Sequence, residues 1–356
     1  MNIEWHKKSL SGGEIVLAGD VGGTNSNLAL VECGENGFEL IVETSVPSPQ
    51  IDSLLPAISD TLREAQSELG EFKLLIACLS GAGPIEGNRC SLSNLSWDLD
   101  GDVIANVLKI PVRIINDFEA ISYGVPLLDL DDPEQVTKVP HSDRSLPEPQ
   151  GDARLVVGAG TGLGVSIMLG DGDGARALPS EGGHASFASF DHETEEVREY
   201  LERHGVTVVE IEDLLSGRGI ASLLEFFLDV RRVLRDDVLD TIQRAAVAER
   251  PALVSKHAEN HPVCRDIMRL FVKIYGRVAA DMAATLLPKR GLFLAGGIVG
   301  KNEEFFLDGS QFVYFFEQNS RPQVQEILRQ IPVYIIRNYS ISLLGAANAG
   351  WIRRNG

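Results

Sequence analysis

The stretch "EIVLAGDVGGTNSNLALVEC", from Glu14 to Cys33, holds two apolar segments of strand length joined by a turn with two adjacent glycines. Short segments rich in Val, Ile and Leu and bounded by Gly, Asn or Asp are typical of β-strands. A third segment of this kind, "ELIVETSV", follows at residues 39–46. The chain is therefore expected to open with three strands in hairpin connection.

After these strands the apolar pattern changes to helical spacing. In "SLLPAISDTLREAQSELG" (residues 53–70) apolar side chains recur at intervals of three and four, which predicts a helix. The strand-like segment "LLIACLSG" follows at 74–81, and a further helix and strand lead to "VRIIND" at 112–117. This order is a β-β-β-α-β-α-β run.

The opening pattern recurs later in the chain. "ARLVVGAG" (153–160) and "GLGVSIML" (162–169) again form strand, glycine turn and strand, which we interpret as an internal duplication visible in pattern and not in residue identity. The preceding segment 129–152 is rich in Asp, Pro and Ser and is interpreted as a long loop or insertion. The remaining expected elements are mostly helix over 194–287 with one long helix at 263–287, strands at 291–297 and 332–338, and a closing helix at 340–351.

Alternating strands and helices in two pseudo-repeated halves predict an α/β protein with two sheets and a central cleft, where ligands bind at the strand ends.

The formal net charge of −19 disfavours nucleic acid and anionic membranes as partners. No apolar run approaches the ~20 residues of a membrane helix. Residues 1–11 lack the apolar core of a secretory signal, so we expect a cytoplasmic protein. The four cysteines lie far apart without a C-x-x-C pair and are expected to be buried small hydrophobes.

The first glycine turn, "GDVGGTN" (19–25), has the composition of a phosphate-binding turn. Glycines let backbone N–H groups approach an anion closely, and Thr24 and Asn25 add side-chain donors. Asp20 could meet the metal that accompanies a phosphate, directly or through water. The alternative is an ordinary tight hairpin with glycine in the left-handed conformation.

Two later glycine turns resemble nucleotide motifs without matching them. "GAGTGLGV" (158–165) has Leu163 where the dinucleotide fingerprint needs its third glycine, and a strand follows it where the fingerprint needs a helix. "AGGIVGKN" (295–302) has Ala295 and Asn302 at two defining P-loop positions. Three turns at strand ends can still surround one nucleotide, with its phosphates at 20–25 and 158–164 and its nucleoside at Gly296 and Gly297.

Two further stretches carry candidate chemistry. In "IINDFEA" (114–120), Asp117 follows a strand and precedes a helix. It is either an N-cap, with Glu119 as a first-turn acid, or a buried carboxylate that takes a proton from an attacking hydroxyl. In "LPSEGGHASF" (178–187), Glu181 and His184 flank two glycines. A metal site is disfavoured because no partner ligands lie nearby, and the glutamates of "FDHETEEV" (190–197) look solvated. Two interpretations of this stretch remain: His184 is a structural histidine, or Glu181 and His184 form hydrogen bonds with a polyhydroxylated ligand.

The ordered set "GDVGGTN", "IND", "GAGTGLGV", "LPSEGGH", "LLSGRG" and "LAGGI" resembles the bacterial-type glucokinases over about residues 15–350. The resemblance implies the hexokinase, actin and Hsp70-like ATPase superfamily, with a duplicated, ribonuclease H-like two-domain fold. It also implies ATP and Mg²⁺ as cofactors, glucose as substrate and a homodimer. The expected smaller domain is 13–125 plus 340–356, and the expected larger domain is 126–339.

The resemblance also implies roles for individual residues in the ATP-dependent phosphorylation of D-glucose to glucose 6-phosphate. Asp117 would be the general base for the 6-hydroxyl. The residues expected to hold the sugar are Asn94, Asn116, Asp117, Glu181, His184 and Glu212. The residues expected at ATP are Asp20, Gly22, Gly23, Thr24, Asn25, Gly160, Thr161, Gly162, Gly296 and Gly297, with Asp20 also near Mg²⁺, directly or through water.

Two departures from the family pattern stand out. Asn27 replaces a common arginine, and segment 129–152 is longer than usual. The zinc-binding cysteine cluster of the related ROK kinases is absent from the sequence.

Three alternatives to a glucokinase remain. A kinase of the same fold could act on another hexose or an N-acetylated amino sugar. A sugar-sensing repressor needs a DNA-binding module, and only 19 residues precede Asp20. A non-sugar ATPase leaves Glu181, His184 and Glu212 unexplained.

Overall fold

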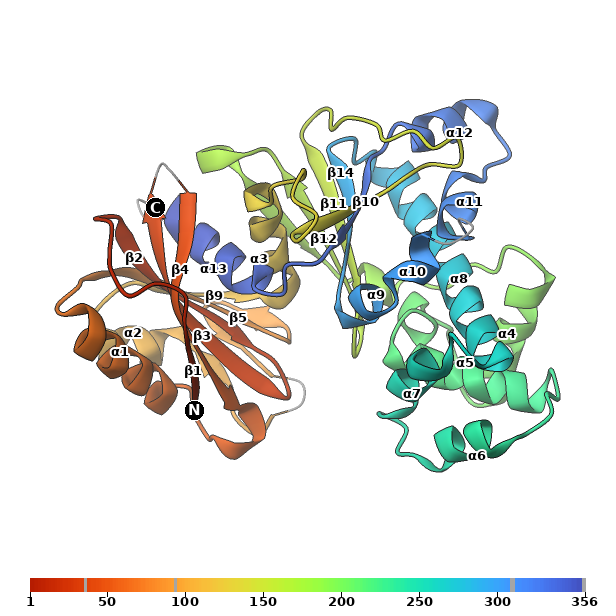
Figure 1. Ribbon diagram of the computed structural model, residues 1–356, viewed down its shortest axis with the longest axis horizontal. Coiled ribbons are helices and arrows are strands. Elements are labelled where there is room, and N and C mark those ends of the chain that lie inside the picture. The colour runs from red at the N-terminus through yellow and green to blue at the C-terminus, as the bar shows by residue number, and fades with distance from the viewer. Residues whose placement is uncertain (35–36, 93–94, 308–310, 354–356) are drawn as a thin grey trace. The chain divides into compact units, whose positions relative to one another are not determined.

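The computed structural model describes residues 1–34, 37–92, 95–307 and 311–353. The chain forms two compact units (Figure 1). Unit 1 comprises Met1–Asp129, Met168–Pro179 and Asn338–Gly356, and unit 2 comprises Leu130–Ile167 and Ser180–Arg337. Residues 168–179, which the sequence assigns to the larger domain, pack with unit 1. The candidate Asn94 lies outside the described residues.

Unit 1 is built on a six-stranded sheet of order β1-β4-β3-β2-β5-β9. Its strands are β1 Asn2–Trp5, β2 Glu14–Val21, β3 Asn25–Gly34, β4 Gly37–Pro47, β5 Leu74–Gly81 and β9 Val112–Asn116. β2, β3 and β4 are antiparallel, whereas β5 and β9 continue from β2 in parallel. The predicted β-β-β-α-β-α-β run is confirmed, and β1 adds an edge strand that the sequence analysis did not anticipate.

Both faces of this sheet are buried. Ile15 and Leu17 of β2 face the cluster that contains Ile58 of α1 (Leu55–Leu69) and Ile104 of α2 (Gly101–Leu108). The alternate residue Val16 faces the opposite cluster, with α3 (Asp117–Gly124) and α13 (Ile341–Ile352). A strand buried on both faces is apolar at every position, which explains the continuous run in the opening stretch. A small third sheet joins β6 Ile85–Glu86, β7 Arg89–Cys90 and β8 Leu99–Asp100.

Small residues let α13 lie close to α3. A Cβ built on Gly345 of α13 would lie 1.8 Å from the carbonyl oxygen of Ala120 in α3, so no larger residue fits there. The "GAANAG" composition of the closing helix therefore reflects close helix packing. This packing brings the first turn of α13 to the carboxyl end of β2.

A second six-stranded sheet repeats the first, and all of it except residues 168–169 and 176–179 belongs to unit 2. Its order is β10-β15-β14-β11-β12-β13, with β10 Val136–Val139, β11 Ala153–Ala159, β12 Leu163–Leu169, β13 Arg176–Ser180, β14 Gly291–Ala295 and β15 Val333–Ile336. β11, β14 and β15 are parallel. The three-residue connection from β11 to β12 is a hairpin, because a parallel pair would need a long crossover. The order β13-β12-β11-β14-β15 thus corresponds to β4-β3-β2-β5-β9, and the predicted duplication is confirmed.

Segment 129–152 is not entirely irregular, contrary to the interpretation as a loop. β10 pairs antiparallel with β15, from Val136 opposite Ile336 to Val139 opposite Val333. Beyond it, His141 Nδ1 lies 3.0 Å from Glu317 Oε1. A four-residue edge strand is too short to show a period of two, and its partner strand follows almost two hundred residues later in the sequence.

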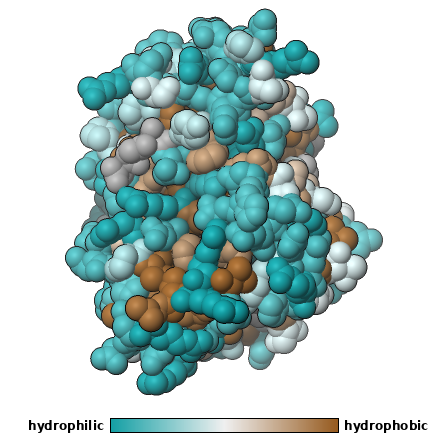
Figure 2. All heavy atoms as spheres, turned by 90° about the vertical axis from the view of Figure 1, so that its right-hand side faces the viewer, coloured by the Kyte–Doolittle hydropathy of each residue, from teal (hydrophilic) through white to brown (hydrophobic). Residues whose placement is uncertain are grey.

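The longest helix of unit 2 is α8, Pro262–Leu286, which agrees closely with the predicted long helix and contacts several of the other helices. The others are α4 His192–Arg203, α5 Gly217–Asp229, α6 Asp237–Arg244, α7 Arg250–His257, α9 Gly297–Lys301, α10 Glu303–Leu307, α11 Gln311–Glu317 and α12 Pro322–Arg329. Figure 2 shows the face that carries many of these helices, and most of it is hydrophilic. Within the described ranges, no helix is long and apolar enough to span a membrane.

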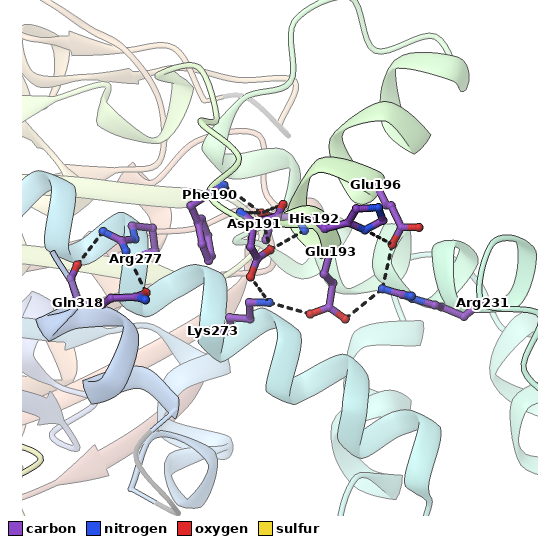
Figure 3. A network of polar contacts seen from close by, with 10 residues as sticks. Phe190, Asp191, His192, Glu193, Glu196, Arg231, Lys273, Arg277 and Gln318 are labelled. Atoms are coloured by element: carbon purple, nitrogen blue, oxygen red, sulfur yellow. Dashed lines mark hydrogen bonds and ion pairs between the residues drawn. The ribbon is translucent and has the colours of Figure 1, made fainter. Parts of the chain in front are cut away.

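The acidic residues at the start of α4 are not simply solvated, contrary to the sequence-based expectation. Asp191 caps α4 and lies 2.6 Å from Lys273 Nζ, which also lies 2.8 Å from Glu193 (Figure 3). Arg231 lies 3.0 Å from Glu196. These ion pairs tie α4 to α8 and to the segment after α5. Sequence spacing alone could not reveal them, because each cation comes from another element.

Candidate active site

The carboxyl ends of β2, β5 and β9 meet at one edge of the unit 1 sheet. Asp20 of β2 lies opposite Ser80 of β5, and Gly81 of β5 lies opposite Asn116 of β9. Ligands in α/β proteins bind at such carboxyl ends. The structure thus brings Asp20, Asn116 and the first glycine turn to a common edge, as the sequence predicts.

Asn116, and not Asp117, caps helix α3. Its Oδ1 accepts hydrogen bonds from the backbone N–H of Phe118 at 2.9 Å and of Glu119 at 3.4 Å. Asp117 is the first residue of the helix. The interpretation of Asp117 as the N-cap is therefore wrong, although its Oδ1 also accepts from the Phe118 N–H at 3.0 Å.

The Asp117 carboxyl lies in an environment that favours its protonated form. Burial, together with the negative charge of Asp20, raises its pKa to about 6, against the hydrogen bonds from Phe118 and Asn116. A general base is most effective when its pKa lies near the working pH. Asp117 can therefore accept a proton near neutral pH.

Two serines hold Asp20 in place. Ser342 Oγ of α13 donates to Oδ2 at 2.7 Å, and Ser80 Oγ lies 3.3 Å from Oδ1. Burial outweighs these hydrogen bonds and raises the pKa of Asp20. Neither serine is predicted from the sequence as a site residue. Ser342 follows Asp20 by more than three hundred residues, and only the packing of α13 brings it near.

Ser48 braces the first glycine turn. Ser48 Oγ donates to the carbonyl oxygen of Gly22 at 2.6 Å, and its N–H donates to that of Thr24 at 2.9 Å. Gly22 N–H donates to the Asn25 carbonyl at 3.0 Å. The turn is a tight hairpin between β2 and β3, but neither Gly22 nor Gly23 has the positive φ that this alternative predicts. Conformational freedom alone does not explain these two glycines.

The second glycine turn is attached to Glu212. Glu212 Oε2 accepts a hydrogen bond from Leu163 N–H at 2.8 Å. A Cβ built on Gly162 would lie 2.4 Å from the same oxygen, so a larger residue here would displace the Glu212 carboxylate from Leu163 N–H. The other side of the turn is held by Gly217 N–H, which donates to the Gly160 carbonyl at 2.8 Å.

The third glycine turn lies beside the second. Parallel pairing places Gly158 of β11 opposite Ala295 of β14, so the two turns emerge at the same sheet edge. Gly296 has a φ of +92°, and a Cβ there would lie 2.3 Å from the carbonyl oxygen of Ala159. Glycine is therefore required both by the backbone conformation and by the close approach of β11. Gly297, which begins α9, has open space around it.

Glu181, His184 and Glu212 also lie close to this edge of unit 2. His184 ends the short helix η4 (Gly182–His184), and Glu212 belongs to η5 (Ile211–Asp213). η4 packs on the start of β12, where a Cβ on Gly183 would lie 2.2 Å from the Leu163 carbonyl. The three side chains differ in accessibility, with 85% of Glu181, 52% of His184 and 13% of Glu212 exposed.

Two charged neighbours of these residues escaped the sequence analysis. Arg218 lies 2.6 Å from Glu212 Oε1, and Glu210 Oε2 lies 2.7 Å from His184 Nδ1. Arg218 is the arginine of "LLSGRG", and Glu210 stands two residues before Glu212. Their proximity in the sequence to the quoted motifs is a signal that could have found them.

Within residues 1–34, 37–92, 95–307 and 311–353, no group of three or more His, Cys, Asp or Glu side chains is arranged to hold a metal ion. All four cysteines are buried and none forms a disulfide, as the sequence predicts. Asn27, at the position of the missing arginine, lies on β3 opposite Asp20.

The duplicated sheet order, with glycine turns at corresponding strand ends, defines a two-domain fold of the actin-like ATPase class. The glucokinase family model matches residues 17–351. The chain belongs to the glucokinase family. It is similar to a glucokinase of Nostoc punctiforme, with 33% identity over 94% of this chain and 98% of that relative.

Solved structures agree with this assignment. A glucokinase from an Antarctic psychrotroph has a TM-score of 0.78 at 27% identity, covering 94% of this chain and 98% of the other. A Balamuthia mandrillaris glucokinase in complex with glucose has a TM-score of 0.74 at 24% identity, covering 97% and 95%. A ROK family glucokinase from Streptomyces griseus, in complex with glucose and AMPPNP, has a TM-score of 0.61 at 19% identity, covering 94% and 98%.

Proposed function

We propose that this protein transfers the γ-phosphoryl group of ATP to the 6-hydroxyl of D-glucose, with Asp117 as general base. The observation that carries the proposal is the Asp117 carboxyl, whose pKa lies at about 6 and which adjoins the strand ends that carry Asp20 and the first glycine turn. Family membership supports the reaction. The glucose and AMPPNP bound in the Balamuthia and Streptomyces relatives support the two substrates.

In the proposed reaction Asp117 removes the proton of the sugar 6-hydroxyl as its oxygen attacks the γ-phosphorus. The bond between that phosphorus and the oxygen bridging to the β-phosphate breaks, and ADP leaves with the electron pair. Phosphoryl transfer depends mostly on positioning and on neutralising charge, so the base contributes only part of the rate. The pKa of Asp117 suits this part, because the carboxylate is ionised at neutral pH and still accepts a proton.

The phosphates of ATP are assigned to the two glycine turns. Gly22, Gly23, Thr24 and Asn25 supply amide and side-chain donors in unit 1, and Gly160, Thr161 and Gly162 supply them in unit 2. Gly296 and Gly297 are assigned to adenosine, because the open space beside Gly297 leaves room for a ligand at the sheet edge.

Asp20 is the residue assigned to Mg²⁺. Its carboxylate is the hard oxygen donor that this ion prefers, and Mg²⁺ is usually held by one or two carboxylates together with substrate phosphates and water. Burial raises the pKa of Asp20, so a neighbouring cation would favour its ionised form. When bound, Mg²⁺ would neutralise charge on the ATP phosphates.

The remaining sugar hydroxyls are assigned to Asn94, Asn116, Glu181, His184 and Glu212. Glu212 already accepts from Leu163 and lies against Arg218, yet a carboxylate has about four lone-pair sites, so it can also accept from a hydroxyl.

We further expect a homodimer, as the resemblance implies. Light scattering coupled to size-exclusion chromatography measures this.

A coupled assay with ATP and a panel of hexoses tests the proposed function. We expect kcat/KM to be highest for glucose and ATP hydrolysis without sugar to be slow. A higher kcat/KM for mannose, fructose or N-acetylglucosamine would favour the kinase of another sugar. Rapid ATP hydrolysis that glucose does not change would favour a non-sugar ATPase.

A further inference from the structure

The imidazole of His184 is already hydrogen-bonded on one side. Its Nδ1 lies 2.7 Å from Oε2 of Glu210, whose side chain is 37% exposed. Its Nε2 lies 3.9 Å from Glu181 Oε2, which is beyond hydrogen-bond distance. The two ring nitrogens of His184 therefore have different environments.

Backbone pairing fixes this arrangement. Ser186 and Glu210 form an antiparallel bridge, Phe187 N–H donates to the Val209 carbonyl at 2.8 Å, and Ile211 N–H donates to the Ala185 carbonyl at 2.9 Å. Asp213 Oδ2 accepts from Glu210 N–H at 2.9 Å. The segments that carry His184 and Glu210 are thus joined by main-chain hydrogen bonds. These bonds hold the side chains of His184 and Glu210 close to one another.

The contact determines where the imidazole carries its proton. An ionised carboxylate only accepts hydrogen bonds, so Nδ1 must carry the hydrogen. In the neutral ring Nε2 then has a free lone pair and accepts from a hydroxyl, and in the charged ring it donates. Without Glu210 the neutral imidazole could exchange between its two tautomers.

We propose that Glu210 positions His184 for sugar binding, by holding the proton on Nδ1 and presenting Nε2 to a sugar hydroxyl. The inference rests on the proposed function, because it assumes that His184 contacts the sugar. Glu210 is a positioning residue, since it acts through His184. Nothing in the motifs quoted from the sequence assigns it a role.

The charged groups around His184 come from three elements. Glu181 precedes η4, Glu210 and Glu212 lie at η5, and Arg218 of α5 neutralises part of the charge of Glu212. The hydrogen bond with Glu210 is the main cause that raises the pKa of His184, and the charges of Glu212 and Glu181 act in the same direction. Removal of Glu210 should therefore lower this pKa.

Two substitutions separate geometry from charge. Glu210→Leu removes the acceptor for Nδ1–H. Because a hydrogen bond to a charged group contributes this much, we expect the KM for glucose to rise about tenfold. We expect kcat and the KM for ATP to change by less than about twofold. Glu210→Gln keeps an acceptor oxygen for Nδ1–H, so it should restore most of the glucose affinity. In that variant the pH midpoint of the glucose KM should still move downward.

Glu196→Gln is the matched control. Glu196 pairs with His192 at 3.5 Å on α4, in the network of Figure 3, and neither residue has an assigned role in catalysis. This variant loses a longer histidine–carboxylate contact and also the ion pair between Glu196 and Arg231, and it keeps every residue assigned to the sugar. Its KM for glucose should equal that of the wild type, and circular dichroism with a thermal melt confirms the folding of each variant.

Nitrogen NMR of the imidazoles gives a readout that does not depend on activity, with His184→Gln used to assign the His184 signals. We expect the Nδ1-protonated form of His184 in the wild type and a lower titration midpoint in Glu210→Gln. An unchanged glucose KM in Glu210→Leu, or an unchanged His184 titration in Glu210→Gln, would overturn the inference. Absence of glucose phosphorylation in the wild type would instead overturn the proposed function, while the NMR result still reports on the Glu210 contact.

Discussion

Burial raises the pKa of the Asp117 carboxyl to about 6, and the negative charge of Asp20 acts in the same direction. The two residues stand at the carboxyl ends of β2 and β9, with β5 between them. Two carboxyl groups near one another do not both ionise easily, so the pKa of one of them is raised. The carboxylate with the higher pKa is the stronger proton acceptor at neutral pH.

This relationship predicts the acid limb of the pH–rate profile. Because Asp117 must be ionised to take a proton, kcat/KM for glucose should rise with pH through a midpoint near the Asp117 pKa of about 6 and then level off. In Asp20→Asn the rate should fall and the midpoint should move to lower pH, because one of the causes of the raised pKa is removed. A midpoint that stays in place in this variant would show that Asp20 does not act on Asp117.

The same pKa predicts how stability depends on pH. Folding raises the Asp117 pKa from 3.8 to about 6, so the folded state binds the proton more tightly than the unfolded state does. Proton binding therefore stabilises the fold at low pH, and this contribution is lost as the pH rises through about 6. Asp117→Asn removes the titration. Relative to the wild type, its free energy of unfolding should therefore increase by roughly 2 kcal/mol between about pH 4.5 and about pH 7.5. Urea titrations at both pH values measure this difference, and a constant difference would contradict the raised pKa.

Ser342 should matter for the metal more than for the sugar. Ser342→Ala removes the 2.7 Å hydrogen bond to Asp20 Oδ2, which frees the carboxylate to change its orientation. We expect the Mg²⁺ concentration for half-maximal rate to rise several-fold, in line with roughly 1 kcal/mol for a hydrogen bond, with little change in the KM for glucose. Ser340→Ala is the control, since Ser340 interacts with Glu43. An equal change in both variants would refute the specific role of Ser342.

Gly162 and Gly160 form a natural pair for testing the second turn. A Cβ on Gly162 would lie 2.4 Å from Glu212 Oε2, whereas a Cβ on Gly160 would meet nothing within 4 Å. Gly162→Ala should lower the free energy of unfolding by roughly 1–3 kcal/mol, as overpacking does, and Gly160→Ala should leave it nearly unchanged. Adding Glu212→Ala to Gly162→Ala should recover part of the loss. Equal effects of the two single substitutions would contradict the geometry of this turn.

The sequence predicts much of the fold because its signals are local. The apolar runs predict most strands of the two six-stranded sheets, and helical spacing predicts α1 and α8. The edge strands β1, β10 and β13 were missed, since they have only four or five residues and show no clear period. The ion pairs of Asp191, Glu193 and Glu196 were missed for the same reason, because Lys273 and Arg231 come from other elements.

The candidate site divides in the same way. Glycine turns and the Asn116–Asp117 pair are visible in the sequence because they follow strand ends. The partners that tune them are not visible, since Ser342 reaches Asp20 only through the packing of α13. The choice between Asn116 and Asp117 as N-cap also needed coordinates, because both residue types cap helices well.

The turnover number of Asp117→Asn for glucose and ATP is the most direct test of the proposed base. Asn has nearly the shape of Asp but cannot accept the proton, so we expect kcat to fall ~10²–10⁴-fold, while glucose binding measured by calorimetry is retained. A kcat equal to that of the wild type would contradict the assignment of Asp117 as general base.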